Sequence, residues 1–441
     1  MLILKNFRIV DETADFTGSL IIENGIIKEI LTGIDNFPGA GIVIDGNNFG
    51  SDAVLMPAFV DLHAHFREPG SPAEGAPPKE ASFPAETLES ASLAAAAGGY
   101  GTVVCMANTK PPIDTIEKAR NLKTRCDTLG LIDLYPVLSL TKNMEGRELS
   151  EIKNLTAPLR LPLMLSEDGK DVTDDGLFLA AMAEGKRLGL PVSCHCDFGG
   201  PEAEAAKKEG RPRAEWSRIE EVNAVRRVIE LGKKAGCHIH IDHVSAKESV
   251  EIIREAKKNL TGGSGFSLTC EVTPHHIGAT ENDARRMGNE GFGRVNPPLR
   301  TEEDRLALIG ALTDGTIDAI ATDHAPHSEA DKAASSPGFI GLETSFTACL
   351  THLTSGITLQ RLSALLSANP ARILGLQDRG KIKAGLRADL TIVDTGAVWK
   401  IEPEKFKSRG KCTPFAGREL RGRILMTLNA GKIVFTGAGC A

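Results

Sequence analysis

The sequence predicts an α/β protein in which a (β/α)8 barrel is joined to a small β domain built from both ends of the chain. Three observations support this prediction. The middle of the chain alternates eight apolar runs with helical stretches, which is typical of βα units and a parallel sheet. Both ends instead show short strand patterns with turn signals. The length of 441 residues accommodates a barrel of about 250 residues with an appended module.

The first segment, residues 1–55, has the pattern of short strands joined by tight turns. The run LILKNFRIV is followed by GSLIIENGIIKEIL, in which Asn24 and Gly25 separate two apolar stretches. An Asn-Gly pair between such stretches is the usual signal of a two-residue hairpin turn. We therefore expect the N-terminal part of the small β domain here.

The second segment, residues 56–378, is predicted to contain the barrel. A strand buried in a parallel sheet is an apolar run of about four to eight residues, and a helix precedes the next strand. The predicted strands are residues 54–63, 100–107, 131–138, 159–165, 190–195, 237–243, 265–273 and 316–322. The predicted helices between them include residues 84–97, 115–129, 174–189 and 216–235.

The last segment, residues 379–441, returns to strand patterns. GKIKAGLRADLTIVD and RGRILMTLNAGKIVF are alternating or apolar runs with glycine-containing turns and no long helical period. Because one strand-rich segment precedes the barrel in the sequence and the other follows it, we expect the two to fold together beside the barrel. We therefore expect residues 379–441 to complete the small β domain begun by residues 1–55.

Composition excludes several functional classes. The chain has 58 acidic and 51 basic side chains, a net charge of −7 and only 5% aromatic residues, which argues against a nucleic-acid binder. No apolar run reaches the about 20 residues of a membrane-spanning helix, and the first residues lack a signal-peptide pattern. We expect a cytoplasmic enzyme with nine reduced cysteines. Composition leaves the eleven histidines, several of them clustered, unexplained.

Metal-competent side chains follow the predicted strands at the carboxyl ends, where the chemistry of a (β/α)8 barrel is found. His63 and His65 end the first strand, and residues two apart on a strand face the same side. Alone, such a pair is more often a hydrogen-bonded strand end than a metal site. Five such endings in one chain favour a metal site. The other four are Ser166–Gly169, Cys194–Cys196, His240–His243 and Thr322–His327.

Imidazole and carboxylate ligands without paired thiolates suit Zn²⁺ in a hydrolytic role. A structural zinc site of the cysteines around His195 is disfavoured, because the second cysteine pair that it needs is missing. On the sixth strand, His238 and His240 face one side and His243 the other, and spacing does not decide between them. We prefer His243, which lies nearest the carboxyl-end rim.

Several motifs resemble those of the type I dihydroorotases of the amidohydrolase superfamily. Residues 63–70 read HAHFREPG and match the HxHxREPG motif of that family. The resemblance covers nearly the whole chain and implies a TIM-like, metal-dependent hydrolase barrel with a composite β domain. Further matches are Ala96–Gly99, Met106–Thr109, His243–Ser245, Thr273–His276, Val295–Arg300, Thr322–His327 and Gly341–Thr344.

This resemblance implies a cyclic amide hydrolase that interconverts N-carbamoyl-L-aspartate and (S)-dihydroorotate in pyrimidine biosynthesis. It implies one or two Zn²⁺ ions per subunit, and we expect two. The implied ligands are His63, His65 and Asp323 for one ion and His195 and His243 for the other. Asp168 would bridge both ions. In many relatives a carboxylated lysine bridges the two ions. The predicted fourth strand, LRLPLML, contains no lysine, so the alternative here is the nearby Lys170.

The implied catalytic group is Asp323, which would carry a proton between the attacking water and the leaving ring nitrogen. The anionic substrate also needs cationic or strongly donating partners. Arg67 is the natural one, since its planar fork matches a carboxylate. The resemblance adds Asn108 and His327 as further carboxylate ligands, and Asn296 with the Gly338–Gly341 segment, including Gly341, as contacts to the ring.

Residues 71–84 depart from the family pattern, because this stretch is longer than in relatives and lacks their usual His-Lys-Glu run. It adjoins Arg67, so we expect it to shape the mouth of the site or an interface. Besides the small-molecule substrate, the expected partner is a second copy of the chain in a homodimer. Association with an aspartate transcarbamoylase is a further expectation.

Two other functions compete with this interpretation. A hydantoinase, dihydropyrimidinase or allantoinase would generally carry the bridging lysine and lack the Arg67 and Asn108 pair. A catalytically inactive homologue acting as a scaffold for a neighbouring pyrimidine enzyme would typically have lost metal ligands, and here all six are present. A substrate panel distinguishes the first alternative, and metal analysis the second.

Overall fold

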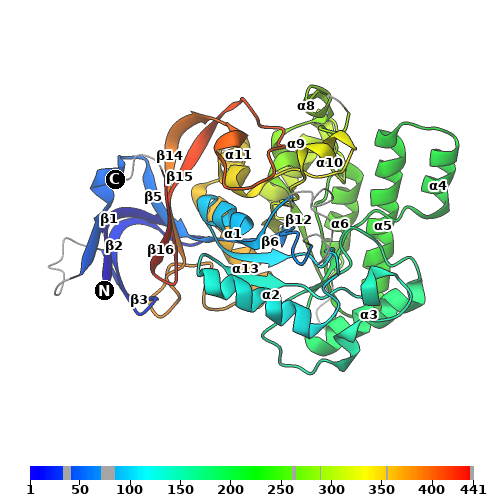
Figure 1. Ribbon diagram of the computed structural model, residues 1–441, viewed down its shortest axis with the longest axis horizontal. Helices are drawn as coiled ribbons and strands as arrows, with labels where there is room; N and C mark the ends of the chain where they lie inside the picture. Colours follow the sequence, from blue (N-terminus) through cyan, green and yellow to red (C-terminus); the bar gives the residue numbers. More distant parts are fainter. Residues whose placement is uncertain (33–40, 71–84, 261–264, 289, 354–355, 438–441) are drawn as a thin grey trace, which may run out of the picture.

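The computed structural model describes residues 1–32, 41–70, 85–260, 265–288, 290–353 and 356–437. It shows a barrel of parallel strands with helices around it, beside a strand-rich domain in which the two ends of the chain lie together (Figure 1). The extended segment 71–84, expected to shape the mouth of the site, lies outside the described residues.

The barrel strands pair in parallel in two groups, β6-β7-β8 and β9-β10-β11-β12-β13. Two isolated parallel bridges, Leu138 with Leu165 and Ala64 with His324, join the groups into a ring. The predicted (β/α)8 barrel is therefore confirmed. Its described strands are β6 (Phe59–Ala64), β7 (Tyr100–Cys105), β8 (Asp133–Pro136), β9 (Leu165–Ser166), β10 (Val192–Cys194), β11 (His238–Ile241), β12 (Ser267–Val272) and β13 (Ala319–Ile320).

Two predicted strands differ from the structure. Residues 54–63 form two strands, because β5 (Ala53–Pro57) pairs with the small sheet before the chain enters the barrel as β6. Both parts are buried, so one apolar run conceals the change of partner. Residues 159–165 contribute only Leu165 to a strand. Pro162 within this run has no N–H to donate to a sheet.

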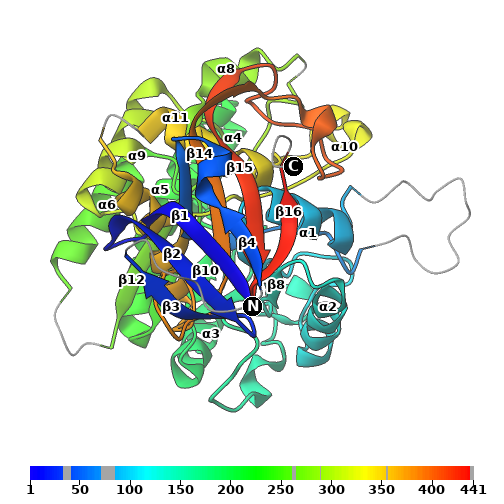
Figure 2. The same cartoon turned by 90° about the vertical axis from the view of Figure 1, so that its left-hand side faces the viewer.

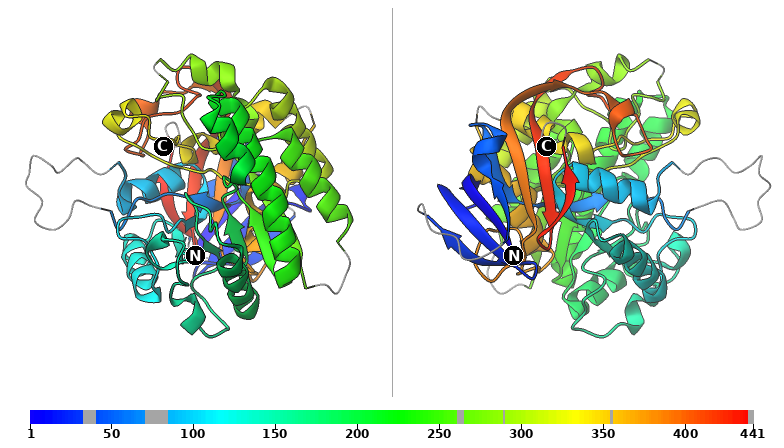
Figure 3. Two further views of the ribbon diagram at one scale, coloured as in Figure 1. Left: turned by 90° about the vertical axis from the view of Figure 1, so that its right-hand side faces the viewer. Right: turned by 60° about the vertical axis from the view of Figure 1, so that its left-hand side comes forward.

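Helices cover the outside of the barrel, and several of them begin at side-chain caps (Figure 3). Thr87, Thr115 and Asp174 each accept a hydrogen bond from a backbone N–H of the first turn, as N-cap residues do. The four helices predicted by range are present as α1, α2, α3 and α5. The longer helices are α1 (Leu88–Ala97), α2 (Ile116–Leu129), α3 (Asp175–Leu188), α4 (Gly200–Lys208), α5 (Arg213–Ala235), α6 (Lys247–Lys258), α9 (Glu302–Asp314) and α11 (Ser345–Leu353). The shorter ones are α7 (Pro274–Gly278), α8 (Glu281–Arg285), α10 (Glu329–Ala333), α12 (Leu359–Ser363) and α13 (Asn369–Ile373).

The small sheet has the strand order β16-β15-β14-β5-β1-β2-β3. Along the same edge of β1, β4 pairs with residues 2–5 and β5 pairs with Arg8 and Ile9. Strands from the two ends of the chain thus lie side by side, coloured blue and orange to red in Figure 2. Asn24 and Gly25 have positive φ angles of 52° and 79° in the turn between β2 and β3, as the sequence predicts. The strands are β1 (Leu2–Val10), β2 (Asp15–Glu23), β3 (Ile26–Leu31), β4 (Ile42–Asp45), β14 (Leu390–Lys400), β15 (Glu419–Asn429) and β16 (Lys432–Thr436).

Each part has its own apolar core. One large cluster fills the barrel and its helix interfaces, and a second lies within the small sheet, where Leu4, Ile9 and Leu390 are fully buried. Among the described helices, none combines the length and apolar character needed to cross a membrane.

Candidate active site

Metal-competent side chains from five strand ends meet at one end of the barrel. The carboxyl ends of parallel strands share one rim, which explains why residues far apart in sequence lie together. All six side chains are buried, with at most 6% of any residue exposed. They are His63 and His65 at the end of β6, Asp168 after β9, His195 after β10, His243 after β11 and Asp323 after β13.

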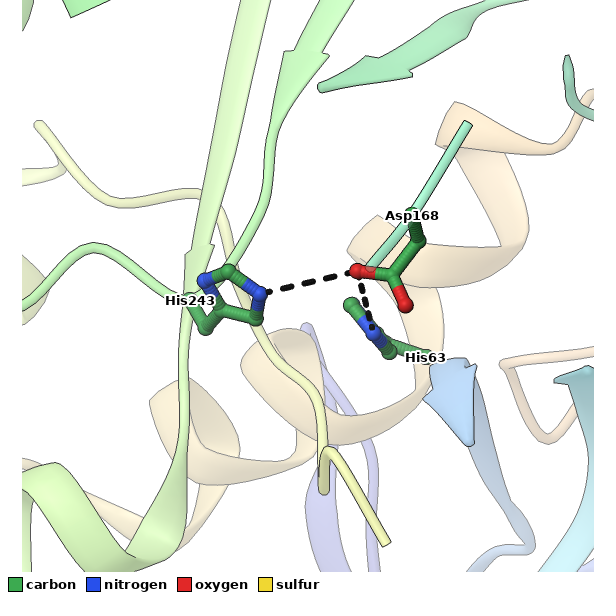
Figure 4. A group of neighbouring side chains, drawn as sticks. All are labelled: His63, Asp168 and His243. Atoms are coloured by element: carbon green, nitrogen blue, oxygen red, sulfur yellow. Dashed lines mark ion pairs between the residues drawn. The ribbon is translucent and has the colours of Figure 1, made fainter. Parts of the chain in front are cut away.

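Asp168 lies at the centre of this group. Its Oδ1 atom is 3.1 Å from His195 Nδ1, 3.4 Å from His63 Nε2 and 3.7 Å from His243 Nε2. Figure 4 shows His63 and His243 both reaching this same oxygen. The other oxygen, Oδ2, is 3.5 Å from His65 Nε2. Asp168 therefore contacts members of both proposed ligand sets, His63 and His65 of one and His195 and His243 of the other.

The donor atoms fit bound metal. Those of His63, His65 and Asp323 lie within 4.8 Å of one another, and so do those of His63, Asp168 and His243. The buried Nε2 atom of His63 has no hydrogen-bond partner among the described residues. Buried polar atoms are rarely left unpaired, so this atom needs a ligand that the chain does not supply. An ion between these imidazoles and carboxylates satisfies that requirement.

Lys170, the alternative bridge, points elsewhere. Its ammonium group donates a hydrogen bond of 3.0 Å to the carbonyl oxygen of Met144. The geometry therefore favours Asp168 over Lys170.

His243 lies in the cluster, and His240 lies behind it. His243 Nε2 is 2.9 Å from His195 Nδ1, whereas His240 contacts Thr269 and Glu271 in the barrel interior. The preference for His243 thus agrees with the geometry.

Three of the site residues adopt a strained backbone. The φ angles of His243, Asp323 and Arg67 are 31°, 44° and 60°, in the left-handed region that non-glycine residues rarely occupy. Such conformations cost about 1–3 kcal/mol each and persist only where the surrounding structure imposes them. Strain concentrated at this rim supports a functional role for these side chains.

In three of the histidines, the ring nitrogen that points away from the cluster lies within hydrogen-bond distance of a neighbouring side chain. His63 Nδ1 lies 3.1 Å from Glu271 Oε1, and His65 Nδ1 lies 2.9 Å from Asn108 Oδ1. His195 Nε2 lies 3.0 Å from Asp197 Oδ2. Partners of this kind fix the ring orientation of metal-binding histidines. The sequence prediction missed Glu271 and Asp197, although a carboxylate within the buried run SLTCEV was a usable signal.

The histidines hold the central carboxylates in their ionised form. Burial alone would raise the pKa of Asp168, but His63, His195 and His243 outweigh it and bring this pKa well below its ordinary value. Burial and His65 oppose each other in the same way at Asp323, and the pKa of Asp323 is also lowered. Both side chains are thus anionic near neutral pH and available to cations.

A cavity of about 230 Å³ opens onto these ligands. It is lined by four of the five residues predicted to bind substrate, namely Arg67, Asn108, Asn296 and His327. Gly341 is not among the described lining residues, since its N–H donates a hydrogen bond of 3.2 Å to His324 Nδ1. Of the segment Gly338–Gly341, it is Gly338 that lines the cavity.

The cavity residues also contact one another and the metal-ligand set. Arg67 Nη2 is 3.2 Å from His327 Nε2. Burial and the nearby Arg67 lower the pKa of His327 to about 4, so this ring is neutral. Its Nε2 atom donates a shorter hydrogen bond, of 2.8 Å, to the carbonyl oxygen of Pro337, and therefore does not accept one from Arg67. Asn108 donates to Asp168 Oδ2 at 3.2 Å while its oxygen faces His65, so its amide links two of the predicted ligands.

Sequence comparison identifies the wider family. The amidohydrolase family model matches residues 54–434. The chain belongs to the amidohydrolase family. Among curated relatives, the dihydroorotase of Clostridium botulinum is 37% identical over 440 residues, covering 98% of this chain and 99% of the relative. The dihydroorotase of Aquifex aeolicus is 35% identical, covering 98% and 99%.

Solved structures of amidohydrolases share the fold. The L-hydantoinase of Arthrobacter aurescens superposes with a TM-score of 0.80 at 24% identity, covering 98% of this chain and 95% of that one. A dihydropyrimidinase from Brevibacillus agri gives a TM-score of 0.80 at 20% identity with the same coverage. At these identities the likeness establishes the amidohydrolase fold alone.

Proposed function

We propose that this amidohydrolase is a dihydroorotase, a cyclic amide hydrolase that interconverts N-carbamoyl-L-aspartate and (S)-dihydroorotate. The main observation is that five of the six clustered histidines and carboxylates line one cavity together with Arg67, Asn108 and His327. The sixth, His63, lies within the same group of donor atoms. Full-length identity of 35–37% to the dihydroorotases of Aquifex aeolicus and Clostridium botulinum supports the same substrate class.

The cluster is proposed to hold Zn²⁺, with two ions per subunit favoured over one. Imidazole and carboxylate groups supply the donors, and the nearby Cys194 and Cys196 thiols contact backbone carbonyl oxygens instead. When bound, such ions lower the pKa of water toward about 7 and polarise an amide carbonyl. The proposed ligands are His63, His65 and Asp323 for one ion, His195 and His243 for the other, and Asp168 for both.

Asp323 is the proposed proton carrier. Its carboxylate lines the cavity and lies 3.1 Å from His65 Nε2, so it is both ionised and accessible to substrate. In hydrolysis it accepts a proton from the attacking water as the new C–O bond forms. It then delivers that proton to the ring nitrogen as the C–N bond breaks, and cyclisation reverses both steps.

Arg67, Asn108 and His327 are proposed to hold the carboxylate of the substrate. The guanidinium of Arg67 supplies charge and a planar set of donors, and the other two side chains border the same space. Asn296 and Gly338 line the wall where the ring would lie, while Gly341 supports that loop through His324.

A metal titration with dihydroorotate hydrolysis tests the proposal. Metal-free wild type should regain activity in proportion to added Zn²⁺ and saturate near two ions per subunit. Asp168→Ala, which lacks the central carboxylate, should bind Zn²⁺ more weakly and regain little activity. A wild type that binds no Zn²⁺ and stays inactive would favour the scaffold alternative.

A substrate panel tests the alternative cyclic amides. Dihydroorotate should be hydrolysed faster than hydantoin, dihydrouracil or allantoin, because only dihydroorotate carries the carboxylate that Arg67 would bind. Faster turnover of hydantoin or allantoin would contradict the proposal.

We further propose that the enzyme acts in the cytoplasm as a homodimer, alone or together with an aspartate transcarbamoylase. Light scattering of the purified protein, with and without such a transcarbamoylase, measures both assemblies. A monomeric species at all concentrations would contradict the homodimer.

A further inference from the structure

A line of hydrogen-bonding groups runs through the barrel interior from the metal-ligand cluster. It begins at Glu271 on β12, which is fully buried. One oxygen of this carboxylate, Oε1, lies 3.1 Å from His63 Nδ1, and the other, Oε2, lies 3.1 Å from His240 Nε2. Glu271 therefore connects a proposed ligand with a histidine that takes no direct part in the cluster.

The line continues away from the rim along the paired strands β11 and β12. His240 Nδ1 lies 2.8 Å from Thr269 Oγ1, and the same hydroxyl lies 2.8 Å from His238 Nε2. Thr269 pairs with His240 in the register of the two strands. The Thr269 hydroxyl thus lies between the two imidazoles of β11, and the Glu271 carboxylate lies between His240 of β11 and His63 of β6.

Only one arrangement of protons satisfies every group in this line when the imidazoles are neutral and the carboxylate is ionised. A carboxylate accepts only, so His63 Nδ1 and His240 Nε2 must both carry hydrogen. Neutral His240 then has an acceptor at Nδ1, to which the Thr269 hydroxyl donates. The Thr269 oxygen in turn accepts from His238 Nε2. The same arrangement leaves His63 Nε2 without hydrogen, facing Asp168 and Asp323.

The surroundings of Glu271 differ from those of an ordinary buried carboxylate. Within the described part of the chain its ion pairs are with His63 and His240 alone. Glu221, which is also buried, is paired with Arg300 at 3.1 Å. A buried anion is stabilised by positive charge close to it. A cation bound at the far nitrogen of His63 would supply such charge through the same ring.

We propose that Glu271 is a positioning residue that orients His63 and keeps His63 Nε2 free for metal, with His240, Thr269 and His238 fixing the proton order behind it. The inference rests on the proposed function, because it assigns Glu271 to the metal site.

The direct test is the affinity of metal-free protein for Zn²⁺, measured by competition with a chelating dye. Glu271→Gln keeps the size of the side chain but replaces one acceptor by a donor. We expect its affinity for Zn²⁺ to fall by about 10- to 100-fold, as for other groups that orient metal-binding histidines. Glu221→Gln is the matched control, since it also neutralises a buried carboxylate and should retain wild-type affinity.

Wild-type affinity in a folded Glu271→Gln variant would overturn the inference while leaving the proposed function intact. A wild type that neither binds Zn²⁺ nor hydrolyses dihydroorotate would overturn both. Loss of affinity in both variants would likewise count against a specific role for Glu271.

A second measurement needs no variant at Glu271. Nitrogen-15 labelling of histidine in the zinc-loaded wild type reports which ring nitrogen carries hydrogen. His238 and His240 should both be neutral and protonated at Nε2. Protonation of His240 at Nδ1 would overturn the proton order and with it the inference.

Discussion

Arg67 is the only arginine or lysine among the described residues that line the site cavity. Arg67→Met keeps much of the aliphatic length and removes the charge and the donors. Hydrogen bonds to charged groups contribute about 1.5–3 kcal/mol, so we expect the KM for dihydroorotate to rise by roughly tenfold or more. Steady-state kinetics at saturating Zn²⁺ measure this change.

The control for Arg67 is a distant, exposed arginine. Arg372 pairs with Glu12 on the surface and its side chain is 60% exposed. Arg372→Met should therefore leave the KM unchanged. An unchanged KM in Arg67→Met as well would show that Arg67 does not bind the carboxylate of the substrate.

Asp323 gives a second prediction at the same scale. Asp323→Asn keeps an oxygen that can contact metal but cannot carry a proton. We expect kcat to fall by about 10²- to 10⁴-fold, the usual contribution of general acid and base catalysis. The zinc content should be measured on the same sample. Substantial kcat with normal zinc content would assign the proton transfer to another group.

Site residues could be predicted from the sequence where their spacing along a single strand indicates their position. The spacing of His63 and His65 on one strand and the position of His243 after another follow from strand geometry. Glu271 was not predictable in this way, because its role depends on a contact with His63 across 208 residues of sequence. The placement of Gly341 behind the cavity wall likewise depends on its hydrogen bond to His324.

At the scale of elements, Arg379 connects the last part of the chain to the barrel. Its Nη1 atom donates hydrogen bonds of 2.8 Å to Asp133 on β8 and to Thr102 on β7. Burial tends to raise the pKa of Asp133, but Arg379 and Lys123 outweigh it and lower this pKa to about 2. The ion pair therefore stabilises the folded state as long as Asp133 is ionised.

The sign of the pH dependence follows from this lowered pKa. Because the folded-state pKa lies below the ordinary value of 3.8, the stabilisation is fully present above about pH 4 and is lost as the pH falls toward 2. Asp133→Asn should lower the free energy of unfolding by about 2 kcal/mol at pH 7, and its difference from wild type should shrink below pH 4. Thermal unfolding between pH 3 and 7 measures this.

Asp127 provides the matched control, since it pairs with the same Lys123 at 3.0 Å but its side chain is 52% exposed. Exposed ion pairs contribute little, so Asp127→Asn should cost less than about 1 kcal/mol. Equal effects of the two substitutions would contradict the role assigned to the buried pair.

The helices and strands could be predicted from the periodicity of apolar residues. The pairing of the strands within the sheets could not. The predicted helices 115–129 and 174–189 agree with α2 and α3 to within one residue at each end. The division of residues 54–63 between two sheets was not predicted, because every residue of β5 and β6 is buried and the two strands read as one run. Apolar character reports burial, whereas the choice of sheet is decided by pairing with β14 or β7.

At the scale of the whole molecule, the two ends of the chain share one sheet, in which β5 lies between β1 and β14. We propose to treat residues 1–55 and 379–441 as one domain and residues 56–378 as the other. Since β14 pairs with β5 over five positions, neither end supplies the sheet alone. The central alternation of strands and helices predicted the barrel, but the adjacency of the ends rests on this long-range pairing.

The barrel ring has a thin seam between β13 and β6. One backbone bridge, Ala64 with His324, joins them in the described chain, together with hydrogen bonds from Thr322 to Asp61. The proposed ligands His63 and Asp323 stand on opposite sides of this seam. A metal ion held by both would therefore join the two edges as well as serve catalysis.

Metal removal should consequently loosen one part of the molecule more than the rest. A ligand at 1000 times its Kd stabilises a folded protein by about 4 kcal/mol, so chelation should lower the Tm. Hydrogen exchange should rise most in peptides containing residues 61–66 and 321–325 and least in β15 of the small sheet. Added Zn²⁺ should restore both readouts. A uniform rise across barrel and sheet would mean that the metal stabilises the molecule as a whole and that the seam has no special dependence on it.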